Sequence, residues 1–486
     1  MRTRVALVIA VLLAGCMMGP DYTRPKIDAP PEFRFEPKAV AETANTEWWK
    51  QYNDPVIEAL IAEALANNRN VKIAAANVLQ AAGLLTQARS ALFPQVGYGG
   101  KGERQKIPDT GFVAIIPNFP NPQTSYEALL SASWEIDLWG RVRRLSEAAL
   151  ANVLVSDNAR NGVILSLVAS VAADYIQLRG LDAQLVIAKQ TLDTYAQSVR
   201  LFELQFKYGQ ISRMNLAQAQ SQYETAAAQI PLIESQIAQM ENALSILLAR
   251  NPGPIARGKS IDELVMPTVP AGVPSSLVER RPDLMQSEQQ LIAANAQIGA
   301  AKALYFPTIS LTGAFGASSS ELSDLFKGPA RVWSYAGQVT GPIFTFGLVS
   351  GQVAQAEAAQ EAALQNYQQT IQNAFADVDN VLVANQKLSE QLAAQQKLVT
   401  ALKTYERLAT LQYNGGYAPY STVLQAQQSL FPAELTLANV RASVLASSVN
   451  IYKAMGGGWV TIASSTTAGG SATKPLDALQ KLPPLF

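Results

Sequence analysis

The chain has 486 residues and no formal net charge, because 38 lysines and arginines match 38 aspartates and glutamates. This balance gives no electrostatic basis for binding nucleic acid. With no histidine and a single cysteine, Cys16, the sequence lacks the side chains most used for acid–base catalysis and zinc binding. We therefore predict no enzymatic activity, no catalytic residues, no metal site and no cofactor.

Residues 1–15 are predicted to be a lipoprotein signal peptide. A short basic region precedes "VALVIAVLLA" (Val5–Ala14), an apolar run too short to span a bilayer. The following "LAGC" resembles the lipobox of bacterial lipoproteins, so Cys16 is the predicted lipidation site and first mature residue. Met17 replaces the aspartate that would resemble an inner-membrane retention signal, which favours the outer membrane. Residues 16–54 are expected to form an acylated, extended segment.

Two copies of one structural unit are predicted, over residues 55–270 and 271–455. A Phe-Pro pair recurs at an offset of 213 in the numbering, and "IDLWGRV" matches "IFTFGLV" at an offset of 207. Strands are expected at about 95–104, 126–138, 308–317 and 331–344, and long helices at about 140–208, 212–250, 347–414 and 420–455. The Ser/Thr/Gly-rich tail, residues 456–486, is predicted to be flexible.

The predicted long helices need partners of similar length. A helix of nearly 70 residues is about 100 Å long, more than a compact domain can bury. The shorter helices contain Pro231 and Pro432, each of which costs about 3 kcal/mol in a helix interior, so a kink or break is expected at both.

The predicted strands alternate between apolar and polar residues, as transmembrane β-barrel strands do. The expected lipid-facing positions are Leu130, Trp134 and Ile136, and the expected lumen-facing positions are Glu127, Glu135 and Asp137. A soluble sheet with one face on a core is an alternative for any single strand. Four strands cannot close a membrane barrel, and open edges are not tolerated in lipid, so the chain is expected to oligomerise.

Several motifs in order resemble the outer membrane factor family, the TolC-like ducts of tripartite efflux pumps. They are the lipobox, "GPDYTRP" (Gly19–Pro25), "RRPDL" (Arg280–Leu284), the two Phe-Pro pairs and "YKAMGGGW" (Tyr452–Trp459). The resemblance implies an α+β membrane protein: a homotrimer with a shared twelve-stranded transmembrane β-barrel, four strands per chain. A long periplasmic α-helical barrel with a mixed equatorial belt would continue it.

The resemblance also implies a function, a location and partners. The expected function is that of a passive outer-membrane exit duct for small molecules, in the drug and metal branch of the family. The chain would be lipid-anchored in the outer membrane and would span it, with a periplasmic adaptor protein and an inner-membrane RND-type pump as partners. The alternatives are a type I secretion duct and a non-channel periplasmic lipoprotein scaffold.

A gate is expected at the periplasmic helix tips. Many relatives carry an aspartate there, with an arginine three residues later, and this sequence places Gln425 and Gln428 at those positions. A spacing of three puts both on one helical face, with Tyr417 and Tyr420 nearby. The alternative is that the two glutamines belong to an ordinary Ala/Gln-rich helix surface.

Overall fold

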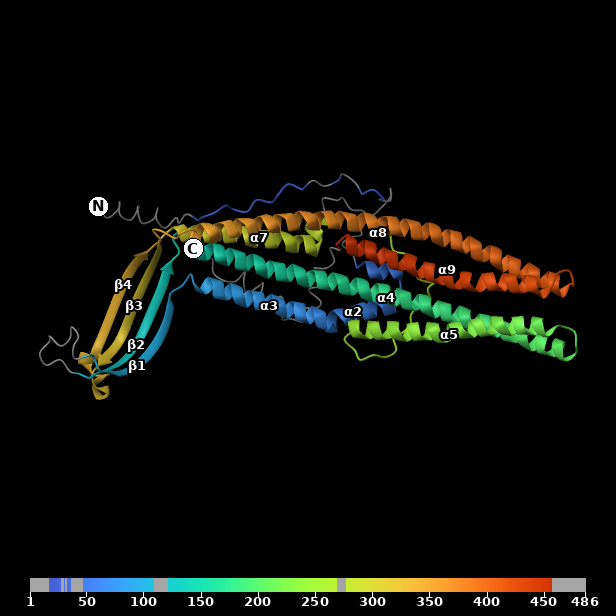
Figure 1. The fold of residues 1–486 in the computed structure, drawn as a ribbon, viewed down its shortest axis with the longest axis horizontal. Helices are drawn as coiled ribbons and strands as arrows, with labels where there is room; N and C mark the ends of the chain where they lie inside the picture. Colours follow the sequence, from blue (N-terminus) through green and yellow to red (C-terminus); the bar gives the residue numbers. More distant parts are fainter. Residues whose placement is uncertain are drawn as a thin grey trace. The chain divides into compact units, whose positions relative to one another are not determined.

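The computed structural model describes residues 17–27, 30, 33–35, 47–108, 121–268 and 277–456 (Figure 1). The predicted lipidation site Cys16, the signal peptide and all but the first residue of the predicted tail lie outside these ranges. The chain divides into two compact units. Unit 1 contains residues 1–26, 78–156 and 287–367, and unit 2 contains residues 27–77, 157–286 and 368–486.

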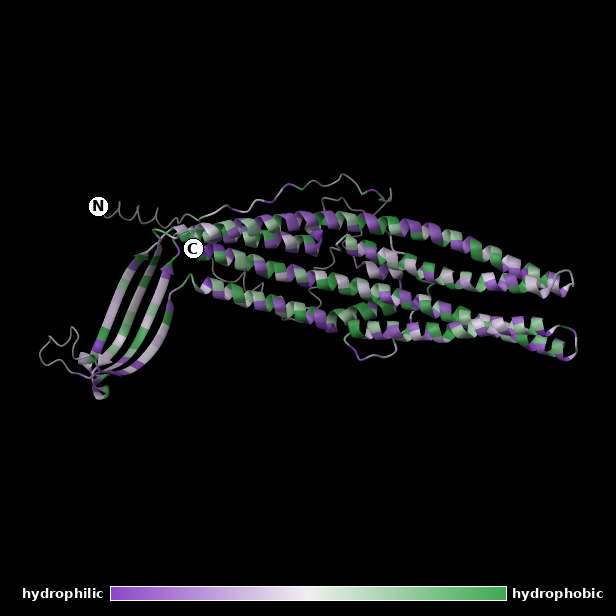
Figure 2. Cartoon of the chain, in the orientation of Figure 1, coloured by the Kyte–Doolittle hydropathy of each residue, from purple (hydrophilic) through white to green (hydrophobic). Residues whose placement is uncertain are grey.

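Unit 1 contains one four-stranded antiparallel sheet in the order β1-β2-β3-β4. Its strands are β1 (Gln95–Gln105), β2 (Gln123–Ile136), β3 (Thr308–Ser319) and β4 (Arg331–Thr340). The short 3-10 helices η5 (Leu322–Asp324) and η6 (Gly328–Ala330) lie between β3 and β4. Each strand carries both hydrophobic and hydrophilic residues along its length (Figure 2).

The two hairpins of the sheet have the same register. Gln95 lies opposite Ser133 in the first hairpin. In the second hairpin, Thr308 lies opposite Thr340. Thr308 corresponds to Gln95 at the offset of 213, and Thr340 corresponds to Ser133 at the offset of 207. The two sequence offsets therefore hold residue by residue through the strands.

The long helices follow the same repeat. They are α4 (Arg141–Lys207), α5 (Arg213–Leu247), α8 (Leu348–Asn414) and α9 (Tyr420–Ala454), and an offset of 207 relates the first pair to the second at every boundary. The start of α3 (Arg69–Ser90) corresponds to the start of α7 (Pro282–Lys302) at an offset of 213. The remaining helices are η1 (Trp48–Tyr52), α2 (Pro55–Asn67), α6 (Leu277–Arg280) and η4 (Ala303–Tyr305).

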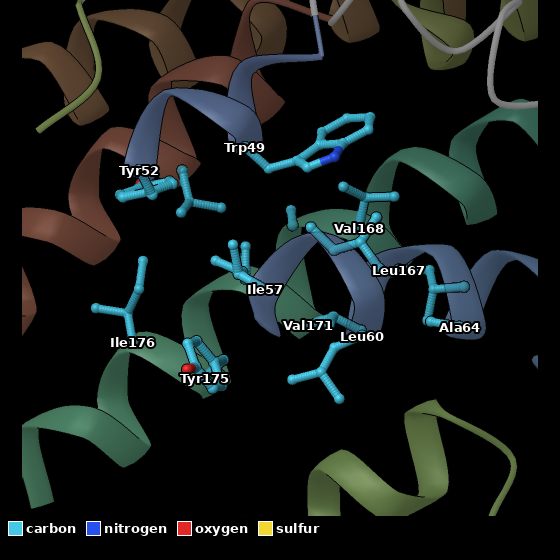
Figure 3. Packing of buried hydrophobic residues seen from close by; sticks show 14 of the residues in the cluster. Trp49, Tyr52, Ile57, Leu60, Ala64, Leu167, Val168, Val171, Tyr175 and Ile176 are labelled. Atoms are coloured by element: carbon cyan, nitrogen blue, oxygen red, sulfur yellow. The ribbon is translucent and has the colours of Figure 1, made fainter. Parts of the chain in front are cut away.

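The largest hydrophobic core lies in unit 2, where η1 and α2 pack against α4 and α9 (Figure 3). The segment before α2 was expected to be extended, but its aromatic residues form η1, and the side chain of Tyr52 is fully buried. Asp54 caps α2: its carboxylate accepts hydrogen bonds from the backbone N of Val56 and from the hydroxyl of Tyr175 on α4, at 2.9 and 3.0 Å. These contacts fix α2 onto α4.

One window of α4 is long and apolar enough to cross a membrane by length and composition. More than half of that window is buried inside the protein. Val168 and Val171 of α4 belong to the core around α2. This burial accounts for the apolar character of the window.

A kink or break was expected at Pro231 and Pro432, and neither helix is broken, because α5 and α9 each continue through their proline. Ile233 and Phe431, which lie beside the two prolines, are buried in one cluster with Tyr195 of α4. Tertiary packing on both sides of each proline offsets the loss of one helical hydrogen bond.

Candidate functional site

One face of the sheet is apolar across all four strands. Directly opposite residues on paired antiparallel strands share a face. The register therefore aligns one row of Tyr98, Leu130, Phe315 and Trp333, and a second of Val96, Ala132, Gly313 and Tyr335. These side chains do not form a core: Tyr98 is 91% exposed and Trp333 68%. An exposed apolar face of this extent indicates contact with lipid or another apolar surface.

The opposite face is small and polar. Two of its rows are Gly97, Ser131, Ala314 and Ser334, and Gln95, Ser133, Thr312 and Ala336, and the row of Gly99, Leu129, Gly316 and Val332 lies on the same face. Residues of the first two rows line a hollow of about 520 Å³. A face of serine, threonine and glycine suits contact with water.

The structure places five of the six predicted strand positions on β2. Leu130, Trp134 and Ile136 share the apolar face, and Glu127 and Glu135 share the opposite one. The prediction for Asp137 is wrong as a strand position, because β2 ends at Ile136. The Asp137 carboxylate instead accepts hydrogen bonds from the backbone N of Val142 and Arg143, at 3.0 and 2.9 Å, and so caps the start of α4.

Both edges of the sheet are open in the single chain. All ten residues of β4 are exposed, and within the described residues β1 and β4 each pair on one side only. Unpaired strand edges are not stable in lipid, and membrane barrels have at least eight strands. The apolar face can therefore reside in a membrane only when further strands complete the sheet.

Each long hairpin of helices ends in a Schellman turn. After α8, the backbone N of Tyr417 donates to the carbonyl of Gln412 and that of Gly416 to Tyr413, while Gly416 has φ +76°. After α4, the same pair of bonds surrounds Gly209, which has φ +71°. Glycine at these two positions allows the tight reversal that forms each tip.

An aromatic cluster joins the two tips. Tyr420 on α9 packs edge-on against Phe202 of α4, with ring centroids 4.2 Å apart, and its ring lies 5.3 Å from that of Tyr413. Burial, with a smaller effect of Tyr413, raises the pKa of Tyr420 to about 12. Tyr420 is thus a packing residue, whereas Tyr417 is 88% exposed.

The predicted gate residues Gln425 and Gln428 are both exposed on α9. The residues between them, Ala426 and Gln427, are buried. The glutamine pair therefore lies on the face of α9 that the chain itself leaves uncovered.

The sequence motifs did not reveal what holds the segment after Cys16. Arg24 forms a bidentate ion pair with Glu288 of α7, at 2.6 and 2.5 Å. Arg144 of α4, with a side chain 2% exposed, binds Asp21 at 2.7 Å. The "GPDYTRP" motif is therefore a strap across α4 and α7, and partners this distant in sequence give no local signal.

The "RRPDL" motif places a buried arginine, Arg281, between two half-exposed carboxylates in unit 2. Pro282 is the first residue of α7, a helix position at which proline is favoured. Arg281 binds Asp283 and Asp377 of α8, at 2.6 and 3.0 Å, and donates to the carbonyl of Ala454 at 3.1 Å. The motif is structural: it joins the start of α7 to α8 and to the end of α9.

Comparisons with known proteins agree with this geometry. A family model described as outer membrane efflux protein matches residues 60–250 and 273–457. The chain belongs to the outer membrane efflux protein family.

Among the residues that the structure describes, no group of three or more His, Cys, Asp or Glu could hold a metal ion.

Individual relatives match over almost their whole length. The chain is 36% identical to the toluene efflux pump outer membrane protein TtgC of Pseudomonas putida, over 93% of this chain and 94% of that protein. It is 34% identical to the cation efflux system protein CusC of Escherichia coli, over 93% and 97%. The crystal structure of the open state of the Neisseria gonorrhoeae MtrE outer membrane channel has a TM-score of 0.83 at 32% identity, over 91% of this chain and 99% of that one.

These findings confirm the family, the fold class, the location and the main function predicted from the sequence. The protein is an outer-membrane efflux channel with the trimeric barrel fold of its family, in which each chain supplies a four-stranded sheet and long helices. It forms the exit duct of an efflux system. Nothing in the comparisons favours the secretion duct or the scaffold.

Proposed function

We propose that three copies of this chain form a passive, non-enzymatic duct whose strand wall presents its polar face to the lumen and whose periplasmic tips form a neutral gate. The observation that supports this wall is the register of the sheet, which places the large aromatic and aliphatic rows on one face and the serine-rich rows on the other. The same face carries charges of both signs, since Lys101 lies opposite Glu127. The wall would therefore admit cargo of either charge.

The helices also require neighbouring copies. The buried residues of α5 include a stripe at seven-residue spacing, Ala219, Ala226 and Ile233, so one narrow face is covered. Its repeat counterpart α9 is buried around much more of its surface, against residues of α4 and α8. A second copy of this chain beside α5 would bury the surface of α5 that is still exposed, as α4 and α8 bury the surface of α9.

The gate is assigned to the exposed glutamine pair on α9. Threefold symmetry would bring three copies of Gln425 and Gln428 around one axis, where amide hydrogen bonds would hold the closed state. A neutral hydrogen bond contributes about 0.5 to 1.5 kcal/mol, against about 1.5 to 3 for bonds to charged groups. Opening should therefore need less energy than in relatives with an Asp and Arg pair.

The remaining partners follow from the family role. Cys16 would carry the lipid that anchors the chain in the outer membrane. The exposed tips, which include Tyr417, would dock a periplasmic adaptor protein that connects the duct to an inner-membrane RND-type pump. The duct itself would have no catalytic residue, metal or cofactor, because transport energy would come from the pump.

Single-channel recording tests the gate. Trimers in planar bilayers should show conductance nearly constant from pH 6 to 8, because the sequence has no histidine to titrate. Divalent cations on the periplasmic side should block little, whereas Gln425→Asp should create block by offering three carboxylates at one level.

Gln425→Asn is the matched control, since it keeps an amide and adds no charge. It should remain as insensitive to divalent cations as the unmodified protein. Strong divalent block of the unmodified protein that persists in all position-425 variants would place the constriction elsewhere.

A further inference from the structure

An aromatic contact joins two of the connections between strands and helices. The residues that correspond to it in the other repeat do not meet within one chain. Trp139, between β2 and α4, stacks on Phe306 with ring centroids 4.6 Å apart. Its indole Nε1 donates to the carbonyl of Pro307 at 2.8 Å. The contact joins the end of the first hairpin to the start of the second.

The repeat offsets identify the counterparts of these residues. Phe346 corresponds to Trp139 at the offset of 207, and Phe93 corresponds to Phe306 at the offset of 213. The side chain of Phe346 is 99% exposed, and that of Phe93 is 49% exposed. Phe93 precedes β1 and Phe346 follows β4, the two opposite edges of the sheet, so the contact cannot close within one chain.

The strand register extends the argument. In the β2–β3 pair, Glu135 lies opposite Ser310 and Ser131 opposite Ala314. Adding 207 to a residue number in β2 gives the corresponding residue of β4, and subtracting 213 from one in β3 gives the corresponding residue of β1. The β2–β3 register therefore translates into a register for β4 against β1 of another copy. The same two offsets relate the observed registers of the two hairpins, which supports their use here.

We propose that the interface between copies of this chain repeats the contact between its two halves. Phe346 packs on Phe93 and Pro94 of a second copy. Strand β4 pairs with β1 of that copy, with Gln338 opposite Lys101. The same register places Ser334 opposite Gln105 and Ile343 opposite Val96 of the second copy. This interface proposal rests on the proposed trimeric barrel and specifies how that barrel closes.

The chemistry of the translated pairs agrees with the faces of the sheet. Gln338 with Lys101 and Ser334 with Gln105 join polar positions, so the polar face continues across the boundary. Ile343, which follows the end of β4 at Thr340, and Val96 are 88% and 72% exposed in the single chain and would cover each other. They repeat the pair of Ile136 with Ile309 inside the chain.

Cysteine cross-linking tests the register with a matched exchange. Two double variants are in register, Lys101→Cys with Gln338→Cys and Gln105→Cys with Ser334→Cys. Two others exchange the partners, Lys101→Cys with Ser334→Cys and Gln105→Cys with Gln338→Cys. Opposite Cα atoms lie about 4.5 to 5.5 Å apart, within disulfide reach, whereas a slip of four residues adds about 13 Å along the strand.

Oxidised outer membranes should give covalent dimers and trimers from the in-register variants only. Cross-links in the exchanged variants, or none in any variant while trimers are present, would overturn the register but leave the trimeric duct intact. Absence of trimers from every variant and from the unmodified protein would overturn both proposals.

The aromatic contact has its own test, which measures the temperature at which trimers dissociate in detergent. Phe346→Ala should lower that temperature by several degrees more than Phe344→Ala, and Phe346→Trp should retain it because Trp139 fills the equivalent place. Phe344 is a suitable control because it is also exposed, at 82%, and because either alanine variant removes the contact between the Phe344 and Phe346 rings, whose centroids are 6.5 Å apart. Equal effects of the two alanine variants would contradict the contact.

Discussion

Arginine at position 132 would place a charge on the apolar face of β2, and arginine at position 133 would place the same charge on the polar face. Ala132 lies opposite Val96 and Gly313, whereas Ser133 lies opposite Gln95 and Thr312. Both side chains being replaced are small, so little packing is lost in either variant. The pair therefore compares the environments of the two faces.

The cost depends on the depth of Ala132 in the membrane. The residue precedes the end of β2 at Ile136 by four positions, which is about 13 Å along the strand and about 10 Å in height for a tilt near 40°. The apolar band of such barrels is about 25 Å tall, so its midplane lies about 12 Å from either border. Ala132→Arg should therefore cost close to the midplane value, about 2 to 4 kcal/mol per chain.

Denaturant unfolding of trimers in lipid vesicles measures this difference. The free energy of unfolding per chain should fall by that amount in Ala132→Arg and by less than about 1 kcal/mol in Ser133→Arg. Equal losses in the two variants, or a larger loss at Ser133, would refute the assignment of the apolar face to lipid.

Two further predictions concern the helical unit. An added Cβ at Gly258 would lie 2.1 Å from Oδ1 of Asp54, so Gly258→Ala should destabilise the protein by about 1 to 3 kcal/mol in thermal unfolding. Gly253→Ala is the control and should change the stability little, because the nearest atom to its added Cβ is 3.9 Å away. Equal melting temperatures for the two variants would contradict the close contact. Because burial raises the pKa of Tyr420 to about 12 from the usual value near 10, its stabilising effect should be complete below pH 10 and lost as the pH rises toward 12. The unmodified protein should lose hydrogen-exchange protection at the tips as the pH rises over that range, and Tyr420→Phe should lose less. Identical pH profiles for the two proteins would count against a buried phenol.

The sequence predicted the elements of the fold better than their tertiary contacts. Internal repetition located the long helices to within a few residues, because a shared offset constrains both copies at once. Asp137 was misassigned because its polarity continued the alternation past the end of the strand, although its position before a helix is also typical of a cap. The burial of Tyr420 depends on Phe202, a residue of the other hairpin, and a periodic pattern on one helix does not identify the element that covers it.

The central claim is that the polar face of the sheet lines a water-filled pore. Its most direct test is the single-channel conductance of Ser133→Cys trimers before and after a negatively charged, water-soluble thiol reagent, with Ala132→Cys as the control. We expect conductance steps in both variants, and a smaller step after modification of position 133 alone. Folded trimers that insert without conductance, or a response at position 132 and none at 133, would contradict the account.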